Sequence, residues 1–482
     1  MRICIIAEGC YPYSVGGVSS WVDSMIRAFP QTDFVLLCVV ANRGLRGKFV
    51  YTLPENVSQV YEVYLEDVDW EQDRRKKARR LNSREYADLR SLLMNLKCNW
   101  DTIFNLFQNR IDSVDQLLMG EDFLHIVTEL YDKHYPEIVY SDFLWTMRSI
   151  YLPLFLVLRS EVPKADLYHC VATGYSGVLG CLGQYLYGGR LLISEHGIYT
   201  REREEELIKA TWVQNTYKGI WIEQFRRMSQ VAYDRADLVT SLYGHARQLQ
   251  LELGCPEEKT RITPNGVDTA RLAQLPGKTE EDEGFINVGA VLRVAPIKDV
   301  KTMIQAFAEA KQRVKALRLW IMGPWEEEPE YAQECFELVR LLKVEDVVFT
   351  GRIDIRDYLG RMDFLLLTSI SEGQPLTILE GFAAKKPTIA TDVGNCRGLL
   401  YGEEGDDLGE AGILTHIMNV EEIGRSIVAL ALDPQRVQRM GETGYRRVMS
   451  RYKLEDMRET YRKLYHQLEH TRKRPGAGKE GR

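Results

Sequence analysis

The sequence predicts an α/β protein of two domains, each a doubly wound parallel sheet. Its 482 residues exceed the roughly 250–300 at which a single core stops growing. Short apolar runs such as residues 3–7, 34–40 and 364–367 have the length of buried strands, and stretches with helical apolar spacing separate them. This alternation is typical of parallel β-α-β units. We therefore expect functional residues at the carboxyl ends of strands, where open α/β sheets bind ligands.

The domain boundaries are predicted from changes in this pattern. We expect the first domain over residues 1–275, interrupted at about 66–135 by a charged helical insertion without a strand pattern. A segment rich in proline, glycine and acidic residues then leads into a second domain over residues 284–450. Residues 451–482 are expected to form a final helix and a basic tail, which is either solvated or touches anionic lipid or a partner.

Composition excludes several classes of protein without identifying one. The net charge of −7 gives no reason to expect nucleic acid as a partner. The nine cysteines are odd in number and contain no Cys-x-x-Cys pattern, which argues against a disulfide framework or a zinc site. The first apolar stretch ends at Glu8, too early for a secretory signal, and no apolar run reaches the ~20 residues of a membrane-spanning helix. We expect a cytoplasmic protein with, at most, peripheral membrane contact.

Two glutamates, Glu372 and Glu380, stand eight positions apart across a predicted strand-to-helix turn. The strand at residues 364–367 is followed by turn residues that include Gly373, and Pro375 suits the first position of a helix. Glu380 would then accept hydrogen bonds from ribose hydroxyls, and Glu372 would face the group attached to a diphosphate. The alternative is two surface glutamates beside an ordinary turn.

The start of the same predicted helix offers an anion site. The backbone N–H groups of Leu376 and Thr377 have no acceptor within the helix, so they are available to a diphosphate.

Two cations, Arg293 and Lys298, occupy the predicted loop after the strand at residues 285–288. At the carboxyl end of a parallel strand they would stabilise negative charge on a departing diphosphate. The alternative is a pair of solvated loop charges.

In the first domain, Gly16 and Gly17 follow the first strand and would let the backbone approach a ligand. His196 follows an apolar strand and precedes a glycine, so we expect it at the same edge of the sheet. Its neighbour Glu195 points the other way, because adjacent residues alternate across a strand. A plain turn and a core histidine are the alternatives for these two sites.

Taken together, Arg293, Lys298, Glu372 and Glu380 resemble the donor site of retaining glycosyltransferases with the GT-B architecture, specifically the family-four group marked by Glu-x7-Glu. The resemblance extends to residues 264–268 and 391–394, and it implies that Gly351, Arg352 and Ile353 bind the nucleotide base. It also implies that His196 binds or orients the transferred sugar and that the final helix returns to the first domain.

The N-terminal half narrows this resemblance. Residues 7–21 and 194–202 resemble the cytosolic glycosyltransferases of Pel exopolysaccharide systems. The family implies transfer of a hexose or N-acetylhexosamine from a UDP-sugar (UDP-glucose, UDP-GlcNAc or UDP-GalNAc) to a glycan acceptor, with retention and beside an inner-membrane polysaccharide synthase complex. It implies no cofactor and no metal. An Asp-x-Asp pattern at residues 67–69, a metal signature of another glycosyltransferase architecture, is expected to be solvated surface.

Three other functions stay open. A glycogen- or starch-like synthase would share the chemistry, a UDP-sugar epimerase would share the architecture, and a nucleotide-sensing subunit would bind without turnover.

Overall fold

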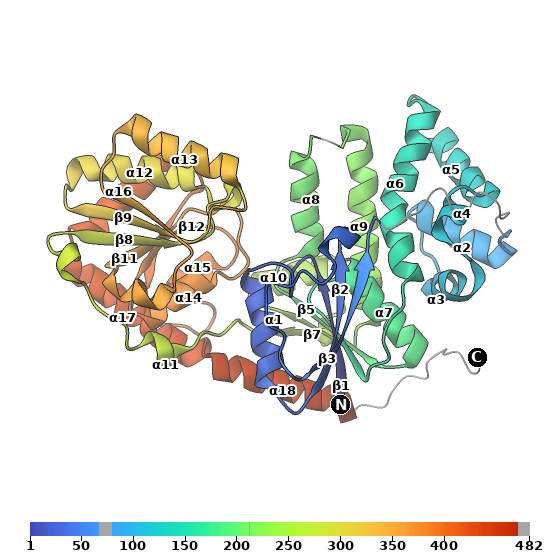
Figure 1. Cartoon of the computed structure of the whole chain (residues 1–482), viewed down its shortest axis with the longest axis horizontal. Helices are drawn as coiled ribbons and strands as arrows, with labels where there is room; N and C mark the ends of the chain where they lie inside the picture. Colours follow the sequence, from blue (N-terminus) through green and yellow to red (C-terminus); the bar gives the residue numbers. More distant parts are fainter. Residues whose placement is uncertain (67–79, 212, 471–482) are drawn as a thin grey trace. The chain divides into compact units, whose positions relative to one another are not determined.

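The computed structural model describes residues 1–66, 80–211 and 213–470. The chain divides into two compact units, the first comprising residues 1–262 together with the described residues from 462 onward, and the second comprising residues 263–461. Each unit contains one parallel sheet, which confirms the predicted fold class (Figure 1). The Asp-x-Asp at residues 67–69 and the basic tail beyond residue 470 lie outside the described residues.

The sheet of the first unit is seven-stranded, in the order β3-β2-β1-β4-β5-β6-β7, and its strands are parallel. The strand order reverses between β1 and β4, which makes that point a topological switch. The strands are β1 (Arg2–Glu8), β2 (Asp33–Val40), β3 (Val57–Tyr64), β4 (Leu167–Cys170), β5 (Arg190–Glu195), β6 (Leu238–Ser241) and β7 (Thr260–Ile262).

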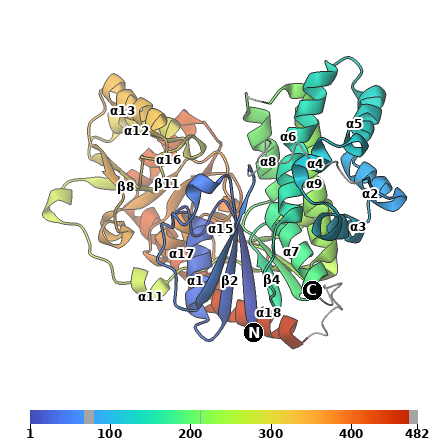
Figure 2. The same ribbon diagram turned by 45° about the vertical axis from the view of Figure 1, so that its right-hand side comes forward.

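Most connections of the first sheet contain α-helices, and the exception joins β2 to β3. The helices α8 and α9 lie side by side and rise beyond the carboxyl edge of the sheet (Figures 1 and 2). The connecting helices are α1 (Gly17–Ala28), α7 (Tyr175–Tyr187), α8 (Tyr199–Lys209), α9 (Asn215–Arg235) and α10 (Gly244–Glu252).

The helical insertion is longer than predicted. It follows β3 and continues past the predicted end at residue 135, because α6 carries the chain through Arg159 before β4 begins. Phe104, Phe123 and Phe155 are fully buried in one core shared with the sheet and α7, so the insertion packs as part of the unit. Its helices are α2 (Ser83–Leu93), α3 (Trp100–Asn105), α4 (Val114–Leu118), α5 (Glu121–His134) and α6 (Tyr140–Arg159).

The sheet of the second unit has the order β10-β9-β8-β11-β12-β13, and its strands are parallel. Its switch point lies between β8 and β11. The strands are β8 (Ile286–Val291), β9 (Leu317–Met322), β10 (Val347–Gly351), β11 (Phe364–Leu367), β12 (Thr388–Thr391) and β13 (Gly412–Thr415).

Helices cover both faces of this second sheet. One face packs against α12, α13 and α16, and the other against α14, α15 and α17 (Figure 1). The helices of this unit are α11 (Thr269–Leu272), α12 (Val300–Arg313), α13 (Pro329–Leu342), α14 (Leu376–Ala383), α15 (Cys396–Tyr401), α16 (Val420–Ala431) and α17 (Pro434–Arg451).

The predicted boundary at residue 275 is wrong, because the chain joins the second unit at Thr263. The backbone N–H of Asn265 donates to Gln374 Oε1 at 2.7 Å, and that of Val267 donates to the carbonyl of Tyr452 at 2.9 Å. These bonds and the burial of Val267 fix the segment to the second core. The second unit ends at Tyr461 and not at the predicted residue 450. The helix α18 (Leu454–His470) therefore belongs to the second unit up to Tyr461 and to the first unit from Arg462.

A buried ion pair ties α17 to the loop that follows α15. The side chains of Arg447 and Asp406 are 0% and 1% exposed, and Arg447 Nε lies 2.7 Å from Asp406 Oδ2. The Arg447 guanidinium also donates to the carbonyls of Leu399 and Gly409. The hydrogen bond from the Arg447 guanidinium to the Asp406 carboxylate lowers the pKa of Asp406 from its usual value. Because both charges are desolvated, removal of either partner leaves the other uncompensated.

The substitution Arg447→Met should therefore destabilise the protein by about 3–5 kcal/mol. The matched control is Arg451→Met, since Arg451 lies 3.9 Å from the same carboxylate but is 34% exposed. Denaturant unfolding of the full chain should show a large fall in the stability of the second unit for Arg447→Met and little change for the control. Equal losses for the two variants would refute the role given to the buried pair.

Candidate functional site

The candidate site lies at the carboxyl ends of β8 and β11, on either side of the switch point of the second sheet. The loop after β8 carries Lys298, and the loop after β11 carries Glu372. Lys298 Nζ lies 2.5 Å from Glu372 Oε1, and the two side chains are 20% and 12% exposed. Two of the four charged residues predicted for this site thus contact each other directly, at the place where open α/β sheets bind ligands.

A hydroxyl locks the two loops together. Thr368, directly after β11, donates from Oγ1 to the carbonyls of Lys298 at 3.0 Å and Asp299 at 3.1 Å. The backbone N–H of Ile370 donates to the carbonyl of Ile297 at 2.9 Å. Asp299 adopts a positive φ of 46° and its side chain caps α12. These contacts hold the backbone of Lys298 beside the start of the loop that carries Glu372. The sequence analysis did not predict this role of Thr368.

The helix α14 begins at Leu376, directly after Pro375, close to the predicted position. Its first backbone N–H groups, which include those of Leu376 and Thr377, have no acceptor within the helix. The side chain of Glu380, one turn further along, makes no hydrogen bond or ion pair with any residue that the structure describes. Desolvation by the surrounding protein raises the pKa of Glu380 from about 4.5 to about 7. This carboxyl group is therefore available to hydroxyl donors of a ligand.

The Glu372–Gly373 turn packs against a second glycine, Gly394. Gly394 has a φ of +53°, and a Cβ there would lie 2.2 Å from the carbonyl oxygen of Glu372 and 2.4 Å from that of Gly373. The next backbone N–H, from Asn395, donates to the Gly373 carbonyl at 2.8 Å. The two loops therefore approach each other closely only because residue 394 has no side chain.

The substitution Gly394→Ala should displace this turn and destabilise the protein by at least ~1 kcal/mol. Gly405→Ala is the control, because Gly405 also has a positive φ, of 76°, but the nearest atom to its added Cβ would be 3.6 Å away. Thermal unfolding should show the larger loss for Gly394→Ala. If Gly394→Ala lost no more thermal stability than Gly405→Ala, the close approach of the two loops would not contribute to stability.

The segment predicted to bind a nucleotide base lies at the end of β10. Gly351 ends the strand with a φ of +70°, and its carbonyl accepts a hydrogen bond from the N–H of Gly323 at 3.1 Å. Arg352 is exposed, and Ile353 packs partly against the second core. Sequence reasoning missed Gly323, where a Cβ would lie 1.9 Å from the carbonyl oxygen of Leu292. The glycine-proline pair at residues 323–324, directly after an apolar run, is the sequence signal that points to it.

Arg293 forms an ion pair within the protein that the sequence did not predict. Its side chain is 46% exposed and forms an ion pair with Glu327, in the loop after β9. The structure thus brings Lys298 and Glu372 together but pairs Arg293 elsewhere, and its contact with a diphosphate stays a prediction.

The switch point of the first sheet is occupied by Glu8, at the end of β1. Its carboxylate accepts hydrogen bonds from the N–H of Tyr175 and the hydroxyl of Tyr199, both at 3.0 Å. Glu8 therefore caps α7, a role that sequence reasoning missed. Nearby, a Cβ added at Gly16 or Gly17 would meet nothing within 4 Å, so packing within the chain does not require either glycine.

His196 and Glu195 point in opposite directions at the end of β5, as expected from strand geometry. Glu195 is buried and accepts hydrogen bonds from Tyr233, Gln250 and Thr173. His196 packs edge-on against Trp21 with ring centroids 4.4 Å apart, and its buried Nε2 has no hydrogen-bond partner among the described residues. Burial lowers the pKa of His196 to about 4, so its imidazole is neutral near pH 7.

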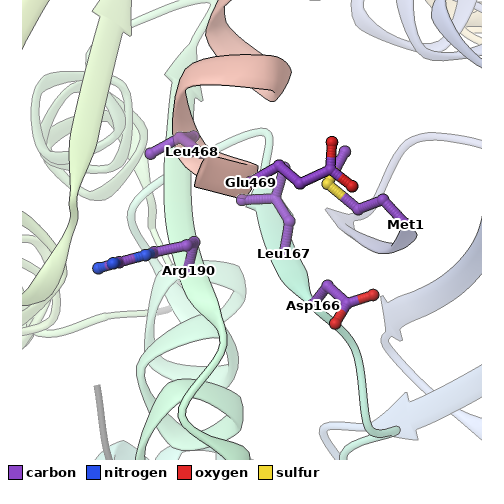
Figure 3. Close-up of a pocket in the computed structure, with 6 residues that line it drawn as sticks. All are labelled: Met1, Asp166, Leu167, Arg190, Leu468 and Glu469. Atoms are coloured by element: carbon purple, nitrogen blue, oxygen red, sulfur yellow. The ribbon is translucent and has the colours of Figure 1, made fainter. Parts of the chain in front are cut away.

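A cavity of about 180 Å³ lies at the opposite edge of the first sheet (Figure 3). Leu167 and Arg190, the first residues of β4 and β5, line it together with Met1 and the end of α18. Because it lies at the amino ends of the strands, this cavity is separate from the candidate site.

Within residues 1–66, 80–211 and 213–470, no three or more His, Cys, Asp or Glu side chains are arranged to hold a metal ion.

Each half of the chain matches the model of a protein family. Residues 1–258 match the model of a family described as a domain of unknown function, DUF3492, and residues 283–433 match the family described as glycosyl transferases group 1. The chain belongs to the DUF3492 family and carries a group 1 glycosyltransferase domain.

The curated relatives of the chain are distant. It is 27% identical over 245 residues to N-acetyl-alpha-D-glucosaminyl L-malate synthase of Bacillus anthracis, an alignment that covers 49% of the chain and 61% of the relative. It is 24% identical over 278 residues to MMP alpha-(1->4)-mannosyltransferase of Mycolicibacterium hassiacum, covering 56% of the chain and 64% of the relative. The chain thus spans less than two thirds of the length of either relative.

Solved structures share the fold of this protein over nearly the whole chain. The Anabaena protein HepE, in complex with UDP and glucose, matches with a TM-score of 0.61 at 15% identity, covering 97% of this chain and 100% of HepE. Sucrose-phosphate synthase from Thermosynechococcus elongatus matches with a TM-score of 0.60 at 15% identity, covering 97% and 98%. These matches establish the two-sheet GT-B fold.

Proposed function

We propose that this protein is a retaining glycosyltransferase that moves a hexose or N-acetylhexosamine from a UDP-sugar to a growing exopolysaccharide of the Pel type. The observation that carries the proposal is the Lys298–Glu372 pair at the switch point of the group 1 domain, beside the open start of α14. The solved structure of HepE, which shares the fold, contains UDP and glucose. The Pel assignment rests on the resemblance of residues 7–21 and 194–202.

The second unit supplies the donor site in this proposal. Lys298, Arg293 and the first N–H groups of α14 bind the diphosphate, and Glu380 accepts hydrogen bonds from the ribose hydroxyls. The backbone of residues 351–353 contacts the base. Glu372, already fixed by Lys298, faces the transferred sugar.

The reaction follows from this placement of charge. The bond between the anomeric carbon and the diphosphate oxygen breaks, and its electron pair passes to that oxygen, where Lys298 stabilises the new negative charge. An acceptor hydroxyl attacks the anomeric carbon from the same face, and its proton passes to the departing phosphate oxygen. The new glycosidic bond therefore keeps the original configuration without a protein nucleophile, a metal or another cofactor.

In the first unit, the groups proposed to contact the substrate are the His196 side chain and the backbone at Gly16 and Gly17. A neutral imidazole with an unpaired ring nitrogen suits a sugar hydroxyl, because it can form a hydrogen bond without a charge. None of the helices in the described part of the chain is long and apolar enough to cross a membrane.

The substitution Lys298→Ala should lower turnover of UDP-hexose by roughly 10²- to 10³-fold, because it removes a cation from the leaving diphosphate. Lys301→Ala is the matched control, since Lys301 is three residues away and pairs with Glu334 on the surface. Release of UDP should be measured with an excess of EDTA. Full turnover by Lys298→Ala would contradict the role of Lys298, and complete loss of wild-type turnover in EDTA would contradict metal independence.

The raised pKa of Glu380 predicts that donor binding depends on pH. Only the ionised carboxylate accepts hydrogen bonds from two ribose hydroxyls, and a pKa near 7 leaves it mostly protonated at pH 6. The affinity for a UDP-hexose should thus rise about tenfold from pH 6 to pH 8. The raised pKa has the opposite effect on the unliganded fold, whose stability falls as pH rises from about 4.5 through 7.

Titration calorimetry with the Glu380→Gln variant tests this assignment. The variant should bind a UDP-hexose more weakly and with an affinity that does not change between pH 6 and pH 8. A variant that keeps the pH dependence of the wild type would show that another group titrates.

Incubation with the UDP-sugar alone separates transfer from epimerisation. An epimerase converts the donor without an acceptor, whereas the proposed enzyme needs a glycan acceptor to release UDP at its full rate.

A further inference from the structure

The helix α18 reaches the interior of the first unit through a tyrosine. Tyr465, on the part of α18 that belongs to the first unit, is 3% exposed, and its hydroxyl lies 2.8 Å from Nδ1 of His169 on β4. Its ring also packs against Phe29, directly after α1, with ring centroids 5.2 Å apart. Tyr465 therefore contacts both the sheet and the end of α1.

The His169 ring is held from its other side as well. Its Nε2 lies 2.8 Å from the hydroxyl of Ser194 on β5, which in turn accepts a hydrogen bond from Thr240 on β6 at 2.9 Å. His169 is fully buried, and burial, together with the nearby His196, lowers its pKa to about 3. A neutral imidazole with partners on both nitrogens has its ring plane fixed by those partners.

The fixed ring supports Trp21, and Trp21 supports His196. Trp21 lies edge-on to His169 with ring centroids 5.8 Å apart and an interplanar angle of 89°. It also lies edge-on to His196, with centroids 4.4 Å apart. Such edge-to-face pairs prefer defined orientations, so a rotation of one ring displaces the next. The contacts form one continuous path from α18 to the carboxyl edge of the first sheet.

We propose that Tyr465 and His169 are positioning residues that set the orientation of His196 through Trp21. This inference rests on the proposed function, in which His196 contacts the substrate. The hydrogen bond from α18 fixes the His169 ring, the His169 ring fixes Trp21, and Trp21 sets the plane of the His196 ring. A small error in that plane lowers the rate while leaving nucleotide binding on the second unit intact.

The variant Tyr465→Phe tests the path because it removes one hydroxyl and keeps the ring in the core. Its kcat should fall about 10- to 100-fold, and its dissociation constant for UDP should stay within about twofold of the wild type. The NMR signal of His196 should shift in protein with isotope-labelled histidine. This signal is assigned by its loss in the variant His196→Asn. If the Tyr465 hydroxyl served only the stability of the fold, its removal would change neither kcat nor the His196 signal.

Tyr461→Phe is the matched control. Tyr461 lies one turn earlier on α18, is 1% exposed, and its hydroxyl bonds Thr263 at 3.2 Å instead of His169. The control should lose similar thermal stability but keep both kcat and the His196 signal. An unchanged His196 signal in Tyr465→Phe, or an equal loss of kcat in the two variants, would overturn the proposal.

The two proposals fail in different ways. If the wild-type protein releases no UDP from any UDP-sugar and acceptor, the proposed function fails, and the His196 signal still tests the path. If the wild type is active and Tyr465→Phe matches it in kcat and in spectrum, only the positioning role fails.

Discussion

The candidate site depends on one hydroxyl, that of Thr368. In a parallel sheet the loops that follow neighbouring strands meet at one edge, but their backbones stay apart unless something joins them. Thr368 joins them by donating to the carbonyls of Lys298 and Asp299. The backbone N–H of Ile370 joins the same two loops by donating to the carbonyl of Ile297, and these loops carry the Lys298–Glu372 pair. The charges of the site are thus held by backbone that is already fixed.

The two units present different chemistry at the carboxyl edges of their sheets. The second unit combines a cation, helix N–H groups and two carboxyl groups, a set that suits a diphosphate and the sugars on either side of it. In the first unit Glu8 and Glu195 are engaged with protein donors, and His196 is neutral. This division is consistent with a donor bound through its charges and a neutral sugar bound through hydrogen bonds.

Much of the fold could be predicted from the sequence, and less of the site. The strand at residues 364–367 and the start of α14 after Pro375 were found because an apolar run, turn residues and a proline act locally. The strand β3 was missed because polar residues such as Ser58, Gln59 and Glu62 interrupt its apolar pattern at the sheet edge. The pairing of Arg293 with Glu327 and the bonds made by Thr368 join distant parts of the chain, so no local pattern predicts them.

We propose that the diphosphate of a nucleotide sugar binds at the carboxyl edge of β8 and β11. Hydrogen–deuterium exchange of the full chain with and without a UDP-hexose tests this most directly, because it reports which backbone amides the ligand protects. We predict slower exchange in residues 293–299 and 371–381. Protection confined to other segments, with unchanged exchange in these two loops, would contradict the assignment.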